Sequence, residues 1–452
     1  MGCFYRLYSV TLQKIFSIDM RFISTSGNYE VDLRQAALHC FAPDGTLYLP
    51  KSLPRIPRAL FNNIGEMTLD EVGYVVMNTL LYRDLSSADI KDVVEMALNF
   101  PIPMVNISAN LGVLELFHGP TLAFKDVSAR FLAALLQKWD KMRTQRFQVL
   151  TATTGNTGGA IANAFAGMGR VEVMVLYPRS ALSRLQSAQF TTIGRNIHAV
   201  EVSGTIAQCK KMVYQACCDH SLDGEVIVTC ANTQNILRIL AQIVPFFWAY
   251  AQLKAANLPA DGFNVAIPCG NLSNLVSAVL AKRMGLPIGK IIAGCNANDD
   301  FVRLLHGEIT IDKVNANSRR TLASAMDTGY PTNIHRILAL YNNDLAALRA
   351  DIEAYAISDD VIAEMVVSSH DELHYEADPH TAVALAAAAQ SPSDGYSVVM
   401  ATAHPAKSLD TMTAITGRAV ELPLQLTKFM GRPIPPIKIA PSYQAFRKLL
   451  TN

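Results

Sequence analysis

The stretch of sequence that decides the fold runs from Leu114 to Arg130 and reads LELFHGPTLAFKDVSAR. Its Gly-Pro pair marks a turn, and the apolar residues spaced three and four apart after it predict a helix. Lys125 stands at the start of this helix, directly after Phe124. Desolvation beside an apolar wall lowers the pKa of a lysine and lets its amine add to a carbonyl carbon. A surface lysine whose stem lies along apolar neighbours is the alternative interpretation, and the pattern alone leaves both open.

Length and composition favour a globular protein with a large interior. The 452 residues exceed one ordinary core and predict two or three subdomains, with 50% hydrophobic and 17% charged residues. A formal net charge of +1 provides no excess of positive charge that would favour binding to nucleic acid or to an anionic membrane. We therefore expect small molecules as partners, with no nucleic acid and no membrane, and a monomer or homodimer.

The eight cysteines predict a cytoplasmic location. They form no Cys-x-x-Cys pair and lack the density of a secreted scaffold, which indicates reduced, buried thiols. No uninterrupted apolar run reaches the roughly 18 residues that a membrane span needs. The most apolar stretch, Ile236 to Leu253, contains Arg238, Gln242 and Pro245. Residues 1–19 have neither a signal-peptide core nor a complete myristoylation signal, and we expect them to be a poorly ordered extension.

Strands and helices alternate through the middle of the chain, which predicts a parallel sheet covered on both faces. Residues 21–50 are expected to form a strand, a helix and a turn, and residues 60–100 to be helical. The expected strands are 147–151, 171–177, 197–202, 225–229, 263–268 and 396–400, and the expected helices between them are 160–168, 183–190 and 205–218.

Two loops each follow a predicted strand and open a helix. The first reads ATTGNTGG from Ala152, and the second reads CGNLSN from Cys269. Free backbone N–H groups at the positive end of a helix dipole suit a phosphate or a carboxylate. Such loops also occur as plain turns or caps, and the first lacks the Gly-x-Gly-x-x-Gly spacing of a dinucleotide site.

A metal site is not expected. His370 and His374 are four residues apart, a spacing that places two side chains on one helix face and suits zinc. However, Asp371 takes the place of the glutamate in a zincin motif, and no third ligand is evident.

Four dispersed motifs resemble the threonine synthase family of enteric bacteria and fungi, over nearly the whole chain from Met20. The family's cofactor-lysine segment, LFHGPTLAFKD, is present without a break from Leu116 to Asp126. The segment ATAHPAK (401–407) is also an unbroken match, and DPHTAVA (378–384) resembles the family's EPHxAVA. The two loops stand where the family has a substrate-facing loop, TSGDTG, and a cofactor-phosphate loop, GNFGD or GNFGN.

The resemblance implies an α/β protein with the tryptophan-synthase-β-like fold, which is fold type II of the pyridoxal-phosphate enzymes. It consists of two parallel-sheet domains and a mainly helical amino-terminal domain. The expected division is an extension (1–19), an amino-terminal domain (20–100), a large cofactor domain (101–140 and 231–424), a small α/β domain (141–230) and a carboxy-terminal tail (425–452).

The resemblance also implies roles for individual residues, with pyridoxal 5'-phosphate as the cofactor. Lys125 is the expected catalytic residue and holds the cofactor as a Schiff base, and Thr402 meets the pyridine nitrogen. The other expected cofactor-binding residues are Gly270, Asn271, Leu272, Ser273 and Asn274. The expected substrate-binding residues are Thr154, Gly155, Asn156, Thr157 and Arg179.

The implied reaction converts O-phospho-L-homoserine and water into L-threonine and phosphate, but the sequence departs from the family pattern near the expected substrate. A lysine and a glutamate of the family are replaced by Ala181 and Ser187, although Arg179 and Arg184 could supply the charge. In the phosphate loop, Ser273 needs a conformation open to a residue with a β-carbon. Two alternatives therefore remain: a lyase with the same cofactor that releases phosphate and a 2-oxo acid, and a catalytically silent binding protein.

Overall fold

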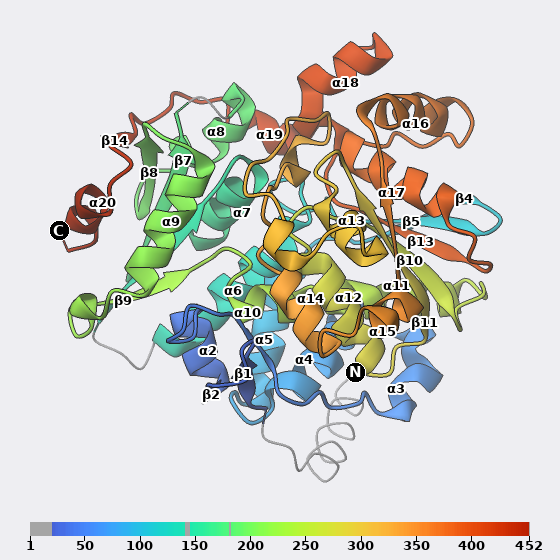
Figure 1. The fold of residues 1–452 in the computed structure, drawn as a ribbon, viewed down its shortest axis with the longest axis horizontal. Helices are drawn as coiled ribbons and strands as arrows, with labels where there is room; N and C mark the ends of the chain where they lie inside the picture. Colours follow the sequence, from blue (N-terminus) through green and yellow to red (C-terminus); the bar gives the residue numbers. More distant parts are fainter. Residues whose placement is uncertain (1–19, 141–144, 180–181, 452) are drawn as a thin grey trace.

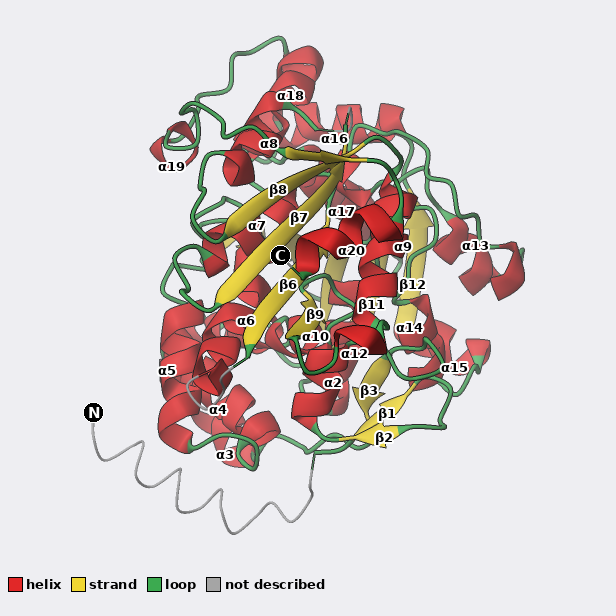
Figure 2. Cartoon of the chain, turned by 90° about the vertical axis from the view of Figure 1, so that its left-hand side faces the viewer, coloured by secondary structure: helices red, strands yellow, loops and turns green. Residues whose placement is uncertain are grey.

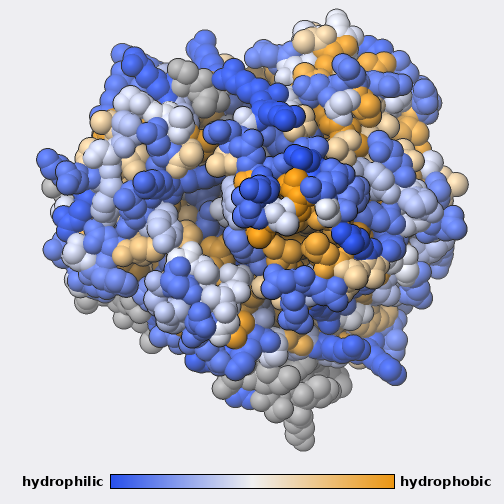
Figure 3. All heavy atoms as spheres, viewed as in Figure 1, coloured by the Kyte–Doolittle hydropathy of each residue, from blue (hydrophilic) through white to orange (hydrophobic). Residues whose placement is uncertain are grey.

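The computed structural model describes residues 20–140, 145–179 and 182–451. The expected extension at residues 1–19 and the departure at Ala181 therefore lie outside the described residues. The described chain contains three sheets with helices packed around them (Figure 1). The face shown in Figure 3 is mostly hydrophilic, with patches of hydrophobic residues.

The amino-terminal region combines a small antiparallel sheet with helices. In this sheet β1 (Phe22–Ser24) lies between β2 (Glu30–Val31) and β3 (Tyr48–Pro50). The predicted strand, helix and turn in residues 21–50 are confirmed, with β2 and β3 in addition. The predicted helical stretch is also confirmed, but as separate helices. The helix within residues 21–50 is α2 (Leu33–His39), and those of the helical stretch are α3 (Arg58–Asn63), η1 (Ile64–Glu66), α4 (Leu69–Leu81) and α5 (Ser87–Ala97).

The second sheet is five-stranded and wholly parallel, in the order β14-β8-β7-β6-β9 (Figure 2). Its strands are β6 (Arg146–Ala152), β7 (Val171–Pro178), β8 (Ile197–Val202), β9 (Val226–Cys230) and β14 (Ile437–Ile439). Its helices are α7 (Asn156–Phe165), α8 (Arg184–Thr191), α9 (Ile206–Cys217) and α20 (Tyr443–Leu450). The four strands and three helices predicted between residues 147 and 229 are confirmed.

Burial on both faces explains why β7 is apolar from Val173 to Leu176, whereas Glu172 near its start is only half-buried and pairs with His198. Val173 and Val175 share a core with residues of α7 and α8, whereas Met174 and Leu176 share another with residues of α9 and α20. Successive side chains of a strand point to opposite faces, so a strand covered by helices on both sides needs apolar residues at every position.

The third sheet has six strands in the order β12-β11-β10-β13-β5-β4, and only β4 runs antiparallel to its neighbour. Its strands are β4 (Met104–Ser108), β5 (Leu111–Glu115), β10 (Phe263–Pro268), β11 (Ile288–Cys295), β12 (Ile352–Ala356) and β13 (Ser397–Ala401). The helices of this part are α6 (Lys125–Asp140), α10 (Ile236–Ala241), α11 (Val244–Ala255), α12 (Ser273–Arg283), α13 (Asp300–His306), α14 (Ile334–Leu340), α15 (Leu345–Asp351), α16 (Asp359–Asp371), α17 (Pro379–Gln390), α18 (Leu409–Thr416) and α19 (Leu424–Thr427).

The most apolar stretch of the chain forms α10 and α11. By length and composition alone, Ile236–Ala255 is the one segment of the described residues that could cross a membrane, and 89% of its most apolar window is buried inside the molecule. Burial of this extent is typical of core helices in globular proteins, which pass the same test.

The parallel strands of both large sheets direct their carboxyl ends to one region. The loop after β6 leads into α7, the loop after β10 leads into α12, and the chain leaving β5 turns into α6. In open α/β sheets, ligands bind in the crevice beyond the carboxyl ends of the strands. The domain boundaries expected from the sequence stay a prediction, with the addition that β14 of the tail pairs with β8.

The buried side chain of Arg336 links the amino-terminal sheet to this region through hydrogen bonds. The side chain lies on α14 and is fully buried. It donates to the carbonyl oxygens of Tyr48 (2.9 Å), Thr233 (2.6 Å) and Gln234 (2.7 Å) and to the side-chain oxygen of Asn333 (2.7 Å). One guanidinium thus satisfies four acceptors that have left water.

Replacing Arg336 by methionine should destabilise the fold strongly. Arg336→Met keeps an unbranched stem but leaves the four acceptors without their donor, so we expect a loss of about 3 to 5 kcal/mol in the free energy of unfolding. Urea unfolding measures the change, and Arg320→Met, at an exposed position, is the control. Equal midpoints for the two variants would contradict this role of Arg336.

Candidate active site

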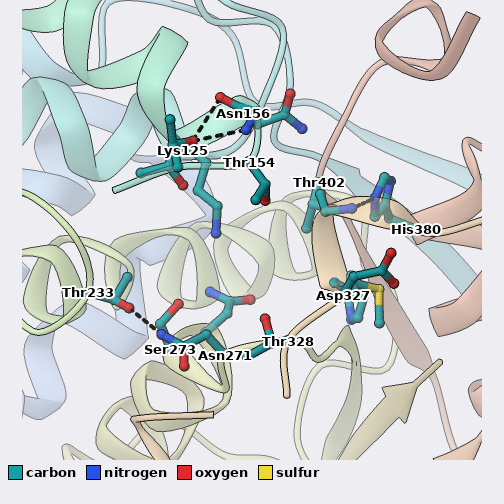
Figure 4. A pocket seen from close by; sticks show the side chains of 18 of the residues that line it. Lys125, Thr154, Asn156, Thr233, Asn271, Ser273, Asp327, Thr328, His380 and Thr402 are labelled. Atoms are coloured by element: carbon teal, nitrogen blue, oxygen red, sulfur yellow. Dashed lines mark hydrogen bonds between the residues drawn. The ribbon is translucent and has the colours of Figure 1, made fainter. Parts of the chain in front are cut away.

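One pocket gathers residues from the ends of both parallel sheets (Figure 4). All of the expected cofactor-binding residues line it, as do all of the expected substrate-binding residues except Arg179. The lining includes Lys125, Thr154, Gly155, Asn156, Thr157, Gly270, Asn271, Leu272, Ser273, Asn274 and Thr402.

The turn before α6 fixes the position of Lys125, the first residue of that helix. The backbone N–H of Thr121 donates to Asp126 Oδ2 (2.8 Å), and its hydroxyl donates to Asp126 Oδ1 (2.6 Å). Gly119 packs so closely on this carboxylate that a β-carbon would lie 2.5 Å from Oδ2. The Phe124 N–H donates to the Thr402 carbonyl (2.9 Å). These contacts explain why the chain needs glycine, threonine and aspartate around the lysine.

The surroundings of Lys125 favour a neutral, nucleophilic amine. Burial, and secondarily the positive charge of Arg238, lowers the pKa of Lys125 to about 7. Arg238 is itself fully buried and is held by the Ser128 hydroxyl (2.8 Å) and the Ala231 carbonyl (2.5 Å). The ammonium position lies 4.2 Å from the centre of the Phe124 ring. A large share of the amine is therefore uncharged near neutral pH, which favours the nucleophile over the surface lysine.

The loop after β10 forms a cradle at the start of α12. Asn271 Oδ1 accepts from the Thr332 N–H (2.7 Å), and Asn271 Nδ2 donates to the Thr233 hydroxyl (3.0 Å). The first turn of α12 leaves backbone N–H groups without intrahelical partners, so the loop offers donors to an anion. At Gly270 a β-carbon would lie only 2.9 Å from the α-carbon of Met326.

The left-handed residue of this loop is Leu272, whereas Ser273 has the conformation open to a residue with a β-carbon that the sequence required. Leu272 has φ 59° and ψ 10°, in the left-handed region, and Ser273 begins α12. A left-handed conformation costs a residue with a β-carbon roughly 1 kcal/mol. The serine at position 273 is therefore compatible with this loop, and the conformational strain is at Leu272.

The loop after β6 forms the facing wall and begins α7 at Asn156, four positions before the predicted start. The Thr153 hydroxyl accepts from the N–H groups of Gly155 and Gly158, each at 3.0 Å. Gly155 has φ 148°, which favours glycine there. The side-chain oxygen of Asn156 is buried without a hydrogen-bond partner. A buried orphan acceptor that lines a pocket suits a ligand that donates a hydrogen bond.

Thr402 completes the lining at the end of β13. Its carbonyl accepts from Phe124, and its hydroxyl has no hydrogen-bond partner among the described residues, so the hydroxyl remains available to a ligand. Taken together, the neutral amine, the anion cradle and this hydroxyl suit pyridoxal phosphate, which has an aldehyde, a phosphate and a ring nitrogen to bind.

Several further lining residues were not predicted as site residues. They are Lys210, Asn232, Thr233, Asp327, Thr328 and His380. His380 belongs to the DPHTAVA motif, for which the family resemblance implies no role. Lys210 and Asn232 had no signal in the sequence, because nothing local shows that a helix or loop position faces a pocket.

His380, at the start of α17, connects Asp378 to the Ala325 backbone. Its Nδ1 hydrogen-bonds the Asp378 carboxylate, and its Nε2 accepts from the Ala325 N–H (3.0 Å). Because Nε2 accepts, Nδ1 is the nitrogen that carries a proton and donates to Asp378. His380 thereby holds the segment that carries Met326, which packs against Gly270.

Three residues considered near the substrate lie away from the pocket lining. The Arg179 side chain is 68% exposed, and its Nε lies 3.6 Å from Glu201. Arg184 is exposed on α8, and the Ser187 hydroxyl donates to the carbonyl oxygens of Ser183 and Arg184 in its own helix. The departure at Ser187 therefore has no direct contact with this pocket.

The histidine pair does not share a helix face. α16 ends at Asp371, so His374 lies beyond it, and His370 contacts Asp371 and Arg418. Across residues 20–140, 145–179 and 182–451, no group of three or more His, Cys, Asp or Glu residues is placed to hold a metal ion.

Comparison with known proteins gives consistent matches along the chain. The family model "Pyridoxal-phosphate dependent enzyme" matches residues 102–402, "Threonine synthase N terminus" matches 21–98, and "Threonine synthase, C-terminal" matches 381–449. The chain is 34% identical over 428 residues to threonine synthase from Escherichia coli (strain K12), covering 94% of this chain and 97% of that protein. It is 30% identical over 447 residues to threonine synthase from Pseudomonas aeruginosa, covering 91% and 94%.

Solved structures agree with these matches. The crystal structure of threonine synthase from Escherichia coli superposes with a TM-score of 0.88 at 32% identity, covering 96% of this chain and all of that chain. A structure of PLP-bound threonine synthase from Brucella melitensis has a TM-score of 0.85 at 29% identity, covering 96% and 99%.

The fold and the pocket thus define a pyridoxal-phosphate-dependent enzyme of fold type II. Within this class the chain belongs to the threonine synthase family, as its motifs indicated.

Attachment of the cofactor should follow the lowered pKa of Lys125. As pH rises through about 7 the amine loses its proton, so the rate at which the apoenzyme develops the visible absorbance of lysine-bound pyridoxal phosphate should rise with a midpoint near that pH. Stopped-flow absorbance measures the profile, and Lys125→Ala should show no such band. A midpoint near the pKa of a free lysine would contradict the assignment.

A methyl group at Gly270 should weaken cofactor binding. In Gly270→Ala the new β-carbon would strike the Met326 backbone, so the loop must shift, and we expect affinity for pyridoxal phosphate to fall by about one to two orders of magnitude. Absorbance titration of the apoenzyme measures this affinity. The control is Gly169→Ala, where a β-carbon meets nothing within 4 Å. Equal affinities would place the cofactor phosphate elsewhere.

Proposed function

We propose that this enzyme converts O-phospho-L-homoserine and water into L-threonine and phosphate, as a pyridoxal-phosphate-dependent carbon–oxygen lyase. The observation that carries the proposal is Lys125, an amine with a pKa near 7 at the centre of a pocket built from the matched family motifs. The similarity to threonine synthases extends over 94% of the chain, so it includes both walls of the pocket.

The cofactor supplies an electron sink for the negative charge that forms when protons leave the substrate carbons. Lys125 is the base and acid of the site and moves protons at Cα, Cβ and Cγ through its Nζ. The Cγ–O bond breaks with its electron pair leaving on phosphate. The hydroxyl of a water molecule then joins Cβ, and a proton joins Cγ, which balances the reaction. A pKa near 7 suits this role, because the amine is found in both protonation states near neutral pH.

We propose that Thr402 binds the ring nitrogen through its hydroxyl. A neutral hydroxyl does not hold a proton on that nitrogen as a carboxylate would, so it limits how far the ring stabilises negative charge on the substrate. The site can then favour elimination and addition over transamination.

The loop after β6 is proposed to bind the substrate and to place the attacking water. Thr154, Asn156 and Thr157 supply small polar side chains on one wall of the pocket. The orphan acceptor of Asn156 is suited to a water or an ammonium group, since either donates a hydrogen bond. The N–H groups at the start of α7 suit the substrate carboxylate.

We also propose a reducing compartment such as the cytoplasm. The cysteines at positions 40, 209, 217, 218, 230, 269 and 295, in the described part of the chain, are all free thiols. Free, mostly buried thiols are typical of proteins that are kept in reducing surroundings.

Product analysis separates the proposed reaction from its alternatives. Because the polar side chains of the loop can hold a water toward Cβ, we expect threonine as the main product from O-phospho-L-homoserine, with one phosphate released per threonine. Amino-acid analysis and a 2-oxobutyrate assay on the same reaction give the ratio. Mostly 2-oxobutyrate would favour the lyase, and no turnover by enzyme with bound cofactor would favour the silent binding protein.

A further inference from the structure

We propose that Lys210 binds the phosphate group of the substrate and holds it as it leaves Cγ. This inference rests on the proposed function, since it assigns a place to one group of the proposed substrate. It concerns a residue of α9 that no motif marks.

The position of Lys210 on α9 directs it to the pocket. Lys210 and Ile206 both line the pocket, and they are four residues apart on one helix. Residues with this spacing lie on the same helix face. The first turns of α9 therefore line the same pocket as Asn156 and Thr157. The neighbouring Lys211 is exposed and does not line the pocket.

When the charged groups of the pocket are paired with those of the bound reactants, the substrate phosphate and Lys210 are left without partners. The bound reactants bring three anionic groups: the cofactor phosphate, the substrate carboxylate and the substrate phosphate. Two cradles of backbone N–H groups, at the starts of α12 and α7, are assigned to the first two. Among the described lining residues, Lys125 and Lys210 are the two with a lysine or arginine side chain, and Lys125 is occupied by the cofactor.

The acidic residue of the lining does not neutralise Lys210. The Asp327 carboxylate accepts from the Thr321 N–H (3.1 Å), from the Thr321 hydroxyl (2.7 Å) and from the Asn296 side chain (3.0 Å). No hydrogen bond or ion pair of the Lys210 ammonium is found among the described residues. Burial alone lowers the pKa of Lys210, and no carboxylate offsets this effect. A phosphate beside the ammonium would replace the lost solvation with a charge-assisted hydrogen bond.

This chain lacks one basic residue of the family pattern, and Lys210 can supply the missing positive charge. Where that pattern has a lysine and a glutamate, this chain has Ala181 and Ser187, so one basic group is missing. Arg179 and Arg184 do not replace it in the pocket lining, because one lies beside Glu201 and the other is exposed. Lys210 provides a positive charge from a different helix of the same sheet.

The test compares Lys210→Gln with Lys211→Gln, which removes the same charge from the adjacent exposed position. Each holoenzyme is titrated, by the absorbance of its cofactor, with a phosphonate in which a methylene group replaces the ester oxygen of O-phospho-L-homoserine. A second titration uses L-threonine, which lacks a phosphate. Steady-state release of phosphate from O-phospho-L-homoserine gives KM and kcat, and Lys210→Arg tests whether a cation in this position restores binding.

We expect Lys210→Gln to weaken phosphonate binding and raise KM by about 10- to 100-fold, the range for a lost hydrogen bond between charged groups. Its affinities for L-threonine and for pyridoxal phosphate should equal those of the wild type. Lys211→Gln should match the wild type, and Lys210→Arg should recover much of the phosphonate affinity.

Two results would overturn the inference. One is equal phosphonate affinity in Lys210→Gln and Lys211→Gln, and the other is an equal loss of phosphonate and threonine binding, which indicates a general structural role. A wild-type enzyme that binds the phosphonate but makes no threonine would instead overturn the proposed function. In that case the two titrations alone decide whether Lys210 binds phosphate.

Discussion

The hydrogen bond from the Phe124 N–H to the Thr402 carbonyl, 2.9 Å long, is the constraint on which the site depends. It joins the turn that carries Lys125 to the end of β13, and an isolated bridge between Ala123 and Ala403 reinforces it. β13 in turn lies between β5 and β10 in the sheet. The lysine, the threonine hydroxyl and the loop after β10 are therefore held by neighbouring strands, which keeps three groups from distant parts of the sequence in one fixed arrangement.

This arrangement buries charged side chains, which lose their solvation by water, and hydrogen bonds compensate for part of that loss. Burial raises the pKa of Asp126, while the two hydrogen bonds from Thr121 favour its ionised form. Arg238 is fully buried, and one of its terminal nitrogens has no partner. A core of apolar residues would be more stable than these buried ions. The structure keeps them at the site, where Asp126 holds the turn and the charge of Arg238 adds to the effect of burial on the pKa of Lys125.

Much of the fold and of the site could be predicted because the signals are local. Apolar runs such as Val173 to Leu176 identify strands like β7, which helices bury on both faces, and the segment around Lys125 is distinctive in eleven consecutive residues. Long-range pairing could not be predicted. β14 has only three residues in a proline-rich tail, and it becomes a strand because β8 offers an open edge. Likewise, Lys210 has the sequence context of an ordinary surface lysine, and only the packing of α9 turns it toward the pocket.

The comparison of two buried lysines shows why Lys125 is the reactive one. Burial lowers the pKa of both Lys125 and Lys407 to about 7, so titration alone does not distinguish them. The Lys407 ammonium donates to the Thr121 carbonyl (3.0 Å) and to Gln189 Oε1 (2.6 Å), which ties the turn before Lys125 to α8. Lys125 has no hydrogen-bond acceptor among the described residues and faces the pocket. An amine that is satisfied by the protein is a structural link, whereas an equally desolvated amine without an acceptor is free to bond to a ligand. Reactivity in this site therefore follows from the absence of an acceptor at Lys125 as much as from its lowered pKa.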